Sequence, residues 1–253
     1  MPSLTIDDLT LWFERKGNGR PVLFLHAFAV THKMWFPQVP ALTAAGYKVI
    51  CVDQRGHGRS SAPPAPYTIA QMAEDIHKLI SGLKLKDVCV VGLSMGGRVA
   101  LRLALDFPQD VSALVLVSAK SESAREIRTE LETFAQKAEQ GEVETAIAEW
   151  YDERYQKLFE HVPQLSHTFL EEWRSKPGWG VAGAARAIIG MQSMTTRVSE
   201  IKVPTLSVAG ACDTPCLPYL AWYEREIPEC RGGVVQGAAH FVNIEQPQLF
   251  NDL

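Results

Sequence analysis

The fold is decided by a stretch near the middle of the chain, which reads Val88-Cys89-Val90-Val91-Gly92-Leu93-Ser94-Met95-Gly96-Gly97. Its first four residues are typical of a buried strand, and the segment Val99 to Phe107 is apolar on nearly every side, as expected of a helix buried against a sheet. Between them, the G-x-S-x-G pattern of Gly92 to Gly96 predicts a sharp strand-to-helix turn. Small neighbours at this turn let Ser94 project from the carboxyl end of the strand as a nucleophile.

Similar strand patterns recur on both sides of this stretch, with helix-length segments between them. They predict an α/β fold with a mostly parallel, doubly wound sheet. The strand-like runs are Val22 to Leu25, Lys48 to Val52, Val88 to Val91, Ala113 to Val117, Thr205 to Ala209 and Gly233 to Val235. Leu4 to Ile6 and Leu9 to Phe13 flank Asp7-Asp8 and predict an antiparallel hairpin at the sheet edge. Thr68 and Gln71 form a capping box at the start of a crossover helix.

The strand pattern stops between about Ser118 and Val203, where helical stripes such as Ile127, Leu131, Phe134 and Ala138 replace it. A chain of 253 residues and 28.0 kDa fits one large domain that carries an insertion. We therefore predict an α/β core formed by residues 1–117 and 204–253 and a helical cap formed by residues 118–203.

Composition excludes several classes of function. Hydrophobic residues make up 46% and charged residues 21%, as in ordinary globular proteins, and the net charge of -4 provides no attraction to nucleic acid or anionic lipid. Neither a signal segment nor a long apolar run is present, which predicts a cytoplasmic protein without a membrane partner. The five cysteines are an odd count, and Cys212 and Cys216 lack a second pair at ligand spacing. We expect no disulfide framework, no metal and no organic cofactor.

A serine hydroxyl needs a base within hydrogen-bond reach, and that base needs a third group to orient it. Asp213 follows the Thr205 to Ala209 strand, and His240 follows the Gly233 to Val235 strand. Because catalytic groups in open α/β sheets gather at the carboxyl ends of the strands, Ser94, Asp213 and His240 are predicted to form a catalytic triad in that chain order.

The negative charge that develops in acyl transfer needs two backbone N–H donors. We predict Met95 N–H as one donor and Phe28 N–H as the other, with Ala27 N–H as the alternative for the second. His26 ends the first parallel strand, and with Ala27 it is a candidate to line the substrate pocket; in the favoured interpretation the His26 ring instead organises this loop by hydrogen bonding. His57 is expected to be structural.

The remaining histidines lie on helical or polar segments, and solvent exposure is the simplest expectation for all of them. They are His32, His77, His161 and His167. No functional role is predicted for these four residues.

With these residues in place, the chain resembles the α/β-hydrolase superfamily. The octet Asp53 to Ser60 looks like the D-x-R-G-x-G-x-S loop of that family, and its glycines predict a tight scaffold turn rather than a catalytic role. Within the superfamily, Gly92 to Gly97, Ala62 to Tyr67 and Ala239 to Pro247 look most like 3-oxoadipate enol-lactonases and related small serine esterases. The resemblance implies lactone opening through an acyl-enzyme.

Two further features follow from the resemblance. The cap of these relatives often carries a Trp-aromatic pair like Trp150-Tyr151, so Trp150 either lines the pocket or belongs to the core of the cap. The chain departs from the family at His26-Ala27, where many relatives have His-Gly; alanine does not readily adopt positive φ, so the loop is expected to differ in shape. It also stops at Leu253, within what relatives make a final helix, which suggests a trimmed end.

The sequence thus predicts an enzyme that hydrolyses a small carboxylic ester or lactone. Cleavage of a carbon-carbon bond, or a cofactor-free haloperoxidase or perhydrolase reaction, stays open on the same triad, and a binding protein with an idle triad is the remote alternative. A substrate carboxylate could be bound by Arg125, Arg128 or Arg186, although solvated positions on helix surfaces are the favoured interpretation for all three.

Overall fold

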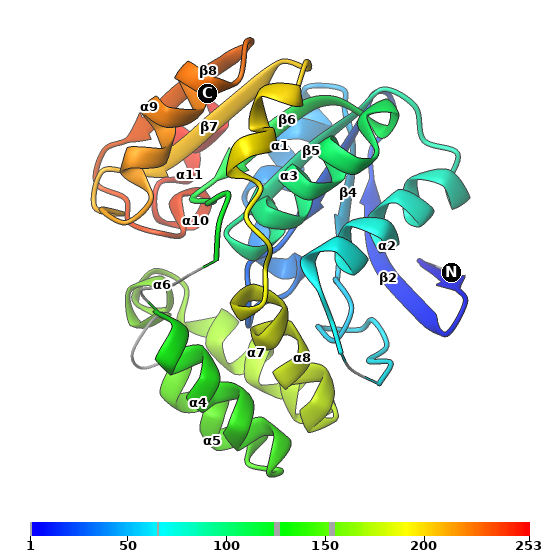
Figure 1. Ribbon diagram of the computed structural model, residues 1–253, viewed down its shortest axis with the longest axis vertical. Helices are drawn as coiled ribbons and strands as arrows, with labels where there is room; N and C mark the ends of the chain where they lie inside the picture. Colours follow the sequence, from blue (N-terminus) through cyan, green and yellow to red (C-terminus); the bar gives the residue numbers. More distant parts are fainter. Residues whose placement is uncertain (1, 65, 124–126, 152–154) are drawn as a thin grey trace.

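The protein is described by a computed structural model that covers residues 2–64, 66–123, 127–151 and 155–253. Within these residues an eight-stranded sheet has the order β1-β2-β4-β3-β5-β6-β7-β8 (Figure 1). The strands are β1 (Ser3–Ile6), β2 (Leu9–Lys16), β3 (Pro21–Leu25), β4 (Lys48–Val52), β5 (Val88–Leu93), β6 (Val111–Val117), β7 (Thr205–Gly210) and β8 (Cys230–Val235). The predicted α/β fold class and its strands are confirmed.

Strand pairing is antiparallel at one edge and parallel through the rest of the sheet. β1 pairs with β2 and β2 with β4 in antiparallel fashion, which confirms the predicted edge hairpin. In the parallel part, Leu93 of β5 lies beside Val117 of β6, Val117 beside Val208 of β7, and Gly210 of β7 beside Val235 of β8. The carboxyl ends of β5, β7 and β8 therefore lie along one edge of the sheet.

Helices cover both faces of the sheet. α2 (Ile69–Gly82) and α3 (Met95–Asp106) lie in front of it in Figure 1, whereas α1 (Gln38–Ala44) and α11 (Pro247–Asn251) lie behind. The remaining helical elements of this part are η1 (His32–Trp35), η2 (Pro108–Asp110), α9 (Leu217–Glu226) and α10 (Val242–Glu245). Thr68 caps α2 by accepting a hydrogen bond from Gln71 N–H at 3.0 Å, as its sequence predicts. Among the described residues, the helices lack the combination of length and hydropathy that a membrane-spanning segment needs.

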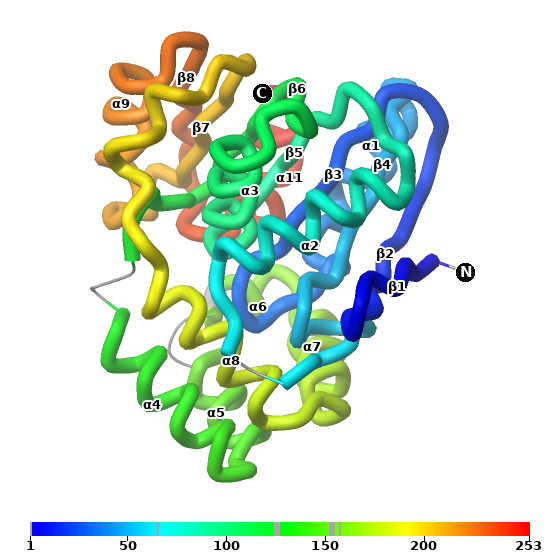
Figure 2. Tube along the Cα trace, turned by 45° about the vertical axis from the view of Figure 1, so that its right-hand side comes forward, coloured from blue at the N-terminus to red at the C-terminus, as the bar shows by residue number. Residues whose placement is uncertain are grey.

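The chain between β6 and β7 is helical, and its helices gather at one end of the molecule in both views (Figures 1 and 2). They are α4 (Arg128–Glu139), α5 (Val143–Trp150), α6 (Gln156–His161), α7 (Pro163–Arg174) and α8 (Gly178–Ile189). Their buried faces match the predicted apolar stripes, for example Leu131, Phe134 and Ala138 on α4. The short helix η5 (Thr195–Glu200) lies apart from them and packs against α3 and α9 of the core (Figure 1).

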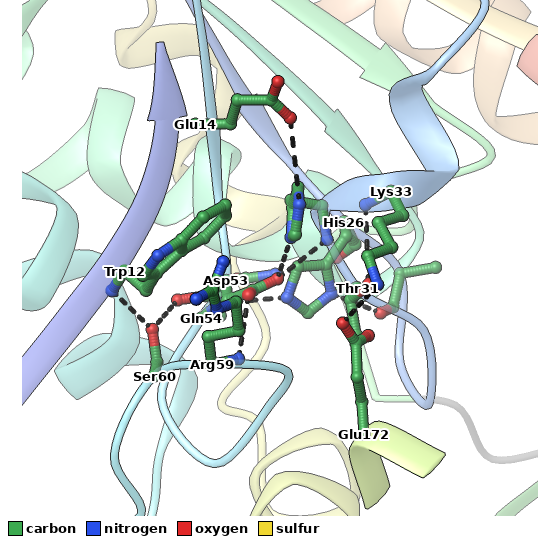
Figure 3. Close-up of polar contacts among 12 residues, drawn as sticks. Trp12, Glu14, His26, Thr31, Lys33, Asp53, Gln54, Arg59, Ser60 and Glu172 are labelled. Carbon is green, nitrogen blue, oxygen red and sulfur yellow. Dashed lines mark hydrogen bonds and ion pairs between the residues drawn. The ribbon is translucent and has the colours of Figure 1, made fainter. Parts of the chain in front are cut away.

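The loop after β4 forms a tight turn around a buried carboxylate (Figure 3). Asp53 accepts hydrogen bonds from the backbone N–H groups of His32 at 2.8 Å and Arg59 at 2.9 Å. Ser60 Oγ accepts from Trp12 N–H at 2.8 Å and so attaches the turn to β2. Gly58 has φ +48°, and a Cβ there would lie 2.4 Å from the Asp53 carboxyl carbon. The turn is therefore scaffold, as the octet predicts.

The prediction that His32 is solvated is wrong. Its side chain is 5% exposed, its Nδ1 lies 2.8 Å from Asp53 Oδ1, and its ring centroid lies 4.4 Å from that of Trp12. The reason is the buried carboxylate of Asp53, which is stable away from water only when polar partners surround it.

His77 is also partly withdrawn from solvent, because its Nδ1 lies 2.5 Å from Asp110 Oδ2. Here too the prediction of a solvated side chain is corrected. His161 and His167 lie on the surface, as expected.

The turn gives a stability test with a matched control. Gly46 has φ +86° and open space where a Cβ would lie, so replacing it by alanine should cost only the left-handed backbone penalty of about 1–2 kcal/mol. Gly58→Ala adds a clash with Asp53 and should cost about 1–3 kcal/mol more. Urea denaturation of both variants measures the difference, and equal losses would contradict the close approach.

Candidate active site

Ser94 lies between β5 and α3 in a strained backbone conformation, with φ 54° and ψ -110°. Two close contacts explain the flanking glycines: a Cβ on Gly92 would lie 2.3 Å from Gly96 O, and one on Gly96 would lie 2.1 Å from Leu25 O. Ser94 N–H donates to Val117 O at 2.9 Å, which fixes the turn to β6. Strain of this kind costs about 1–3 kcal/mol and tends to occur at functional sites.

Asp213 and His240, predicted as acid and base, are in direct contact. Asp213 follows β7 and is 6% exposed, while His240 follows β8 and its side chain is 36% exposed. His240 Nδ1 lies 2.9 Å from Asp213 Oδ2. The Cys212 N–H bond to Ala238 O, at 2.9 Å, joins the two loops that carry the pair.

This contact shifts both pKa values. Withdrawal from water opposes the cation of His240, but the hydrogen bond and negative charge of Asp213, together with Cys216, outweigh it and raise the pKa of the imidazole above its usual value. Burial would raise the pKa of Asp213, and the hydrogen bond from His240 reverses that effect and lowers it. The pair is therefore stable as a carboxylate facing an imidazole that readily holds a proton.

Ser94 directly follows β5, and Asp213 follows β7, which is separated from β5 by one strand of the sheet, β6. No hydrogen bond from its side chain to His240 is found within the described ranges. Catalytic hydrogen bonds are often long before substrate binds, so the serine-histidine contact stays a prediction.

The loop after β3 carries the predicted oxyanion donors. Ala27 N–H donates to Met34 Sδ at 3.3 Å, so the alternative donor already has a partner. Within the described part of the chain, no acceptor is found for Phe28 N–H. The left-handed residue of this loop is Ala29, with φ 56°, rather than Ala27, where positive φ was the concern. This arrangement favours Phe28 as the second donor.

Aromatic side chains of the helical region hold this loop through its carbonyl groups. Tyr155 O–H donates to Phe28 O, Tyr151 O–H donates to Ala29 O at 2.7 Å, and Trp173 Nε1–H donates to the same oxygen at 3.1 Å. Burial raises the pKa of the Tyr151 hydroxyl well above its usual value, so it stays a donor. The sequence pointed to the Trp150-Tyr151 pair, but not to Tyr155 or Trp173 nor to the carbonyls that these side chains bind.

Trp150 packs against the same loop. Its ring lies edge-on to Phe28 with centroids 5.2 Å apart, and the side chain is buried. The neighbouring Phe134 ring lies 5.8 Å away. These contacts favour the core interpretation of Trp150 over the pocket one.

His26 supports the base of the loop (Figure 3). Gln54 N–H donates to its Nε2 at 2.9 Å, and its Nδ1 lies 2.7 Å from Ala27 O, so Nδ1 carries the proton. Burial lowers the pKa of His26 to about 4, which keeps the ring neutral. With both nitrogens occupied by backbone groups, the loop-organising role is favoured. His57 is likewise buried, 4.8 Å from His26 between ring centroids.

The next candidates are an apolar groove elsewhere on the protein and the arginines that the sequence offered for a substrate carboxylate. A groove of about 430 Å³ lies on the sheet face between α1 and α11, but its mainly apolar lining does not include Ser94, Asp213 or His240. Arg128 and Arg186 are exposed and paired with Glu132 and Glu139. Arg125 lies outside the described residues. Cys216, which the sequence did not single out for the site, lies beside Asp213 and His240.

Residues 20–247 match the family model described as the alpha/beta hydrolase fold, and the chain belongs to this family. The 3-oxoadipate enol-lactonase 2 of Acinetobacter baylyi is 30% identical over 253 residues, which cover 98% of this chain and 93% of the relative. A putative non-heme chloroperoxidase of Synechocystis sp. is 27% identical and covers 99% of this chain, which spans 94% of it. The predicted enol-lactonase-like resemblance is confirmed.

Solved structures agree with this family. A thermophilic esterase from Thermogutta terrifontis has a TM-score of 0.86 at 28% identity, with 99% of this chain and 94% of the esterase covered. The fold and the sequence therefore place the chain among the enol-lactonase-like α/β-hydrolases.

We predict that Tyr155→Phe lowers kcat for an activated ester by about 10- to 100-fold with little change in KM, because the Phe28 carbonyl loses a partner that holds the loop in place. The control is Tyr223→Phe, which also removes a buried hydroxyl but one that lies on α9 rather than against the loop after β3. Steady-state kinetics of both variants provide the test; equal kcat values for them would contradict the positioning role.

Proposed function

We propose that the chain hydrolyses a small carboxylic ester or lactone through an acyl-enzyme on Ser94. The observation that carries the proposal is the Asp213–His240 hydrogen bond of 2.9 Å, at the same sheet edge where a strained turn presents the serine. A strained nucleophile, an oriented imidazole and a buried carboxylate are the groups that acyl transfer requires.

In the first step His240 Nε2 accepts the Ser94 proton while Oγ attacks the substrate carbonyl carbon. Asp213, bonded to Nδ1, fixes the tautomer that leaves Nε2 free to accept that proton, and it stabilises the imidazolium that forms. The N–H groups of Met95 and Phe28 stabilise the oxyanion. His240 then protonates the leaving oxygen, which in a lactone stays attached to the acyl group.

In the second step His240 removes a proton from water, and the hydroxide attacks the acyl-enzyme carbonyl. Collapse of this intermediate releases the carboxylic acid and returns the proton to Ser94. Side chains, backbone donors and water supply the whole reaction, so the proposal includes no metal or organic cofactor. The partner is a small molecule, and we propose a cytoplasmic location.

The helical region 118–203 is proposed to act as the cap of this site. Its side chains Tyr151, Tyr155 and Trp173 reach the loop after β3, which follows the carboxyl edge of the sheet. The cap would thus shape the pocket and also fix an oxyanion donor.

A second candidate is a haloperoxidase or perhydrolase reaction, in which hydrogen peroxide replaces water in the second step. The similarity to a protein named as a putative non-heme chloroperoxidase favours its inclusion. Carbon-carbon bond hydrolysis would use the same groups. Product analysis with an ester in the presence and absence of peroxide distinguishes peracid from acid formation.

Ser94→Ala should lower kcat for a nitrophenyl ester by at least about 10⁴-fold, since the covalent step is lost, and should leave the melting temperature nearly unchanged. A fluorophosphonate probe should label the unaltered chain and the control Ser199→Ala, whose serine is exposed, but not Ser94→Ala. Labelling or full turnover of Ser94→Ala would reject the nucleophile, and an inert unaltered chain would favour a binding protein.

The pH profile tests the base. Since Asp213 raises the pKa of His240, and only the neutral ring accepts a proton, kcat/KM should fall as the pH drops through a value above the ordinary histidine pKa of about 6.5. In Asp213→Asn the negative charge is lost, so this limb should move to lower pH while kcat falls by about 10⁴-fold. Identical limbs in both proteins would show that Asp213 does not act on the base.

A further inference from the structure

Cys216 and Asp213 lie side by side because the turn after β7 places them three residues apart at the start of α9. Cys216 N–H donates to Asp213 O at 2.9 Å, and Leu217 N–H donates to the same oxygen at 3.1 Å, as in one helical turn. The Cys216 thiol is 4% exposed, whereas Cys212 is exposed. The buried thiol therefore faces the same space as the Asp213 carboxylate.

His240 completes this group from the neighbouring loop. One ligand atom from each of Asp213, Cys216 and His240 lies within 4.8 Å of the other two, and the nitrogen that faces Asp213 is Nδ1. The thiol donates a weak hydrogen bond to Ser118 O at 3.5 Å and also interacts with the side chains of Asp213 and His240. Carboxylate oxygen, imidazole nitrogen and thiolate sulfur form a donor set that suits zinc and similar ions.

The spacing suits a tetrahedral ion. Zinc bonds of about 2.0–2.3 Å place neighbouring ligand atoms about 3.3–3.8 Å apart. The Nδ1–Oδ2 distance of 2.9 Å is slightly shorter than this range, and the limit of 4.8 Å for the set is slightly longer. Small side-chain rotations would bring all three atoms onto one ion, and the 36% exposure of the His240 side chain provides an entry path and a place for water as fourth ligand.

We propose that Asp213, Cys216 and His240 bind a divalent ion of the Zn²⁺ or Cd²⁺ type, and that the ion inhibits the enzyme. The inhibition rests on the function proposed above, but the binding does not. The site is distinct from a catalytic zinc centre, because the ion would occupy the two groups that the serine mechanism needs.

Proton movements explain the inhibition. The Cys216 S–H bond breaks, its proton goes to solvent, and the thiolate binds the ion. Nδ1 of His240 must provide a lone pair to the ion, so the ring proton moves through solvent to Nε2, or leaves if the ring was protonated at both nitrogens. Nε2 then carries a proton and cannot accept that of Ser94. No oxidation or reduction is involved.

Binding is measured with Cd²⁺ alone, from the ultraviolet absorbance of the cadmium-thiolate bond, and with Zn²⁺ by titration calorimetry. The unaltered chain should bind one ion, and Cys216→Ser should weaken binding by at least about 10- to 100-fold, a loss typical even of residues just outside a coordination sphere. Cys212→Ser is the matched control, since it removes a nearby exposed thiol, and its affinity should equal that of the unaltered chain.

Turnover is then measured for each protein relative to its own rate without metal. Zn²⁺ should inhibit the unaltered chain and Cys212→Ser, EDTA should reverse the inhibition, and Cys216→Ser should need at least about tenfold more Zn²⁺ for the same loss. Equal sensitivity of the two cysteine variants, or absence of a cadmium-thiolate band that depends on Cys216, would overturn the proposal.

Ser94→Ala separates this proposal from the proposed function. It should keep the metal affinity of the unaltered chain, because the nucleophile is not a ligand. An unaltered chain without esterase activity that still binds Cd²⁺ through Cys216 would reject the function and keep the site. An unaltered chain that is active but does not bind Cd²⁺ through Cys216 would reject the metal site and keep the proposed function.

Discussion

The close approach of two backbones at the end of β5 is the constraint on which the site depends. Gly96 lies against Leu25 O so closely that a Cβ would lie 2.1 Å from it, and this contact joins the start of α3 to the end of β3. Ser94 is thereby held at φ 54°. The same Cβ would lie 2.7 Å from His26 O, so the residue after Met95 packs against the first residue of the loop that carries Phe28. One steric requirement thus links the turn of the proposed nucleophile to the start of the loop that carries the proposed second oxyanion donor.

The loop that carries Phe28 is fixed from two sides. From the core, His26 bonds to the backbone of Gln54 and to Ala27 O. Because a peptide plane is rigid, fixing the Ala27 carbonyl also fixes Phe28 N–H, the next group in the chain. From the helical region, aromatic side chains bind the carbonyls of Phe28 and Ala29. Substitutions in the helical region would therefore alter the position of the proposed donor Phe28 N–H without contacting the substrate.

The regular periodicity of apolar residues was sufficient to predict the strands of the sheet and the points where they end. The strand ends could be placed from apolar runs, and because parallel strands align their carboxyl ends, the contact between Asp213 and His240 follows from topology. Local patterns do not report which buried charge needs a partner. The buried Asp53 contacts His32, which lies 21 residues before it in the chain, and no local sequence pattern predicts this pair. The left-handed turn at Ala29 was missed for a similar reason, because tertiary hydrogen bonds rather than residue type stabilise it.

Cys216 shows how one environment supports two kinds of chemistry. A carboxylate that is held ionised in a buried place attracts a proton on a neighbouring imidazole, and this makes the ring an oriented base. The same negative charge also attracts a divalent cation, to which Nδ1 provides a lone pair once its proton has left, and a thiol one helical turn away adds a sulfur ligand that suits zinc. An aliphatic side chain at position 216 would leave His240 as the base and remove the sulfur ligand, and with it the inhibition by the metal ion. The proton and the metal ion therefore compete for one nitrogen, and the identity of residue 216 decides how strongly the metal competes.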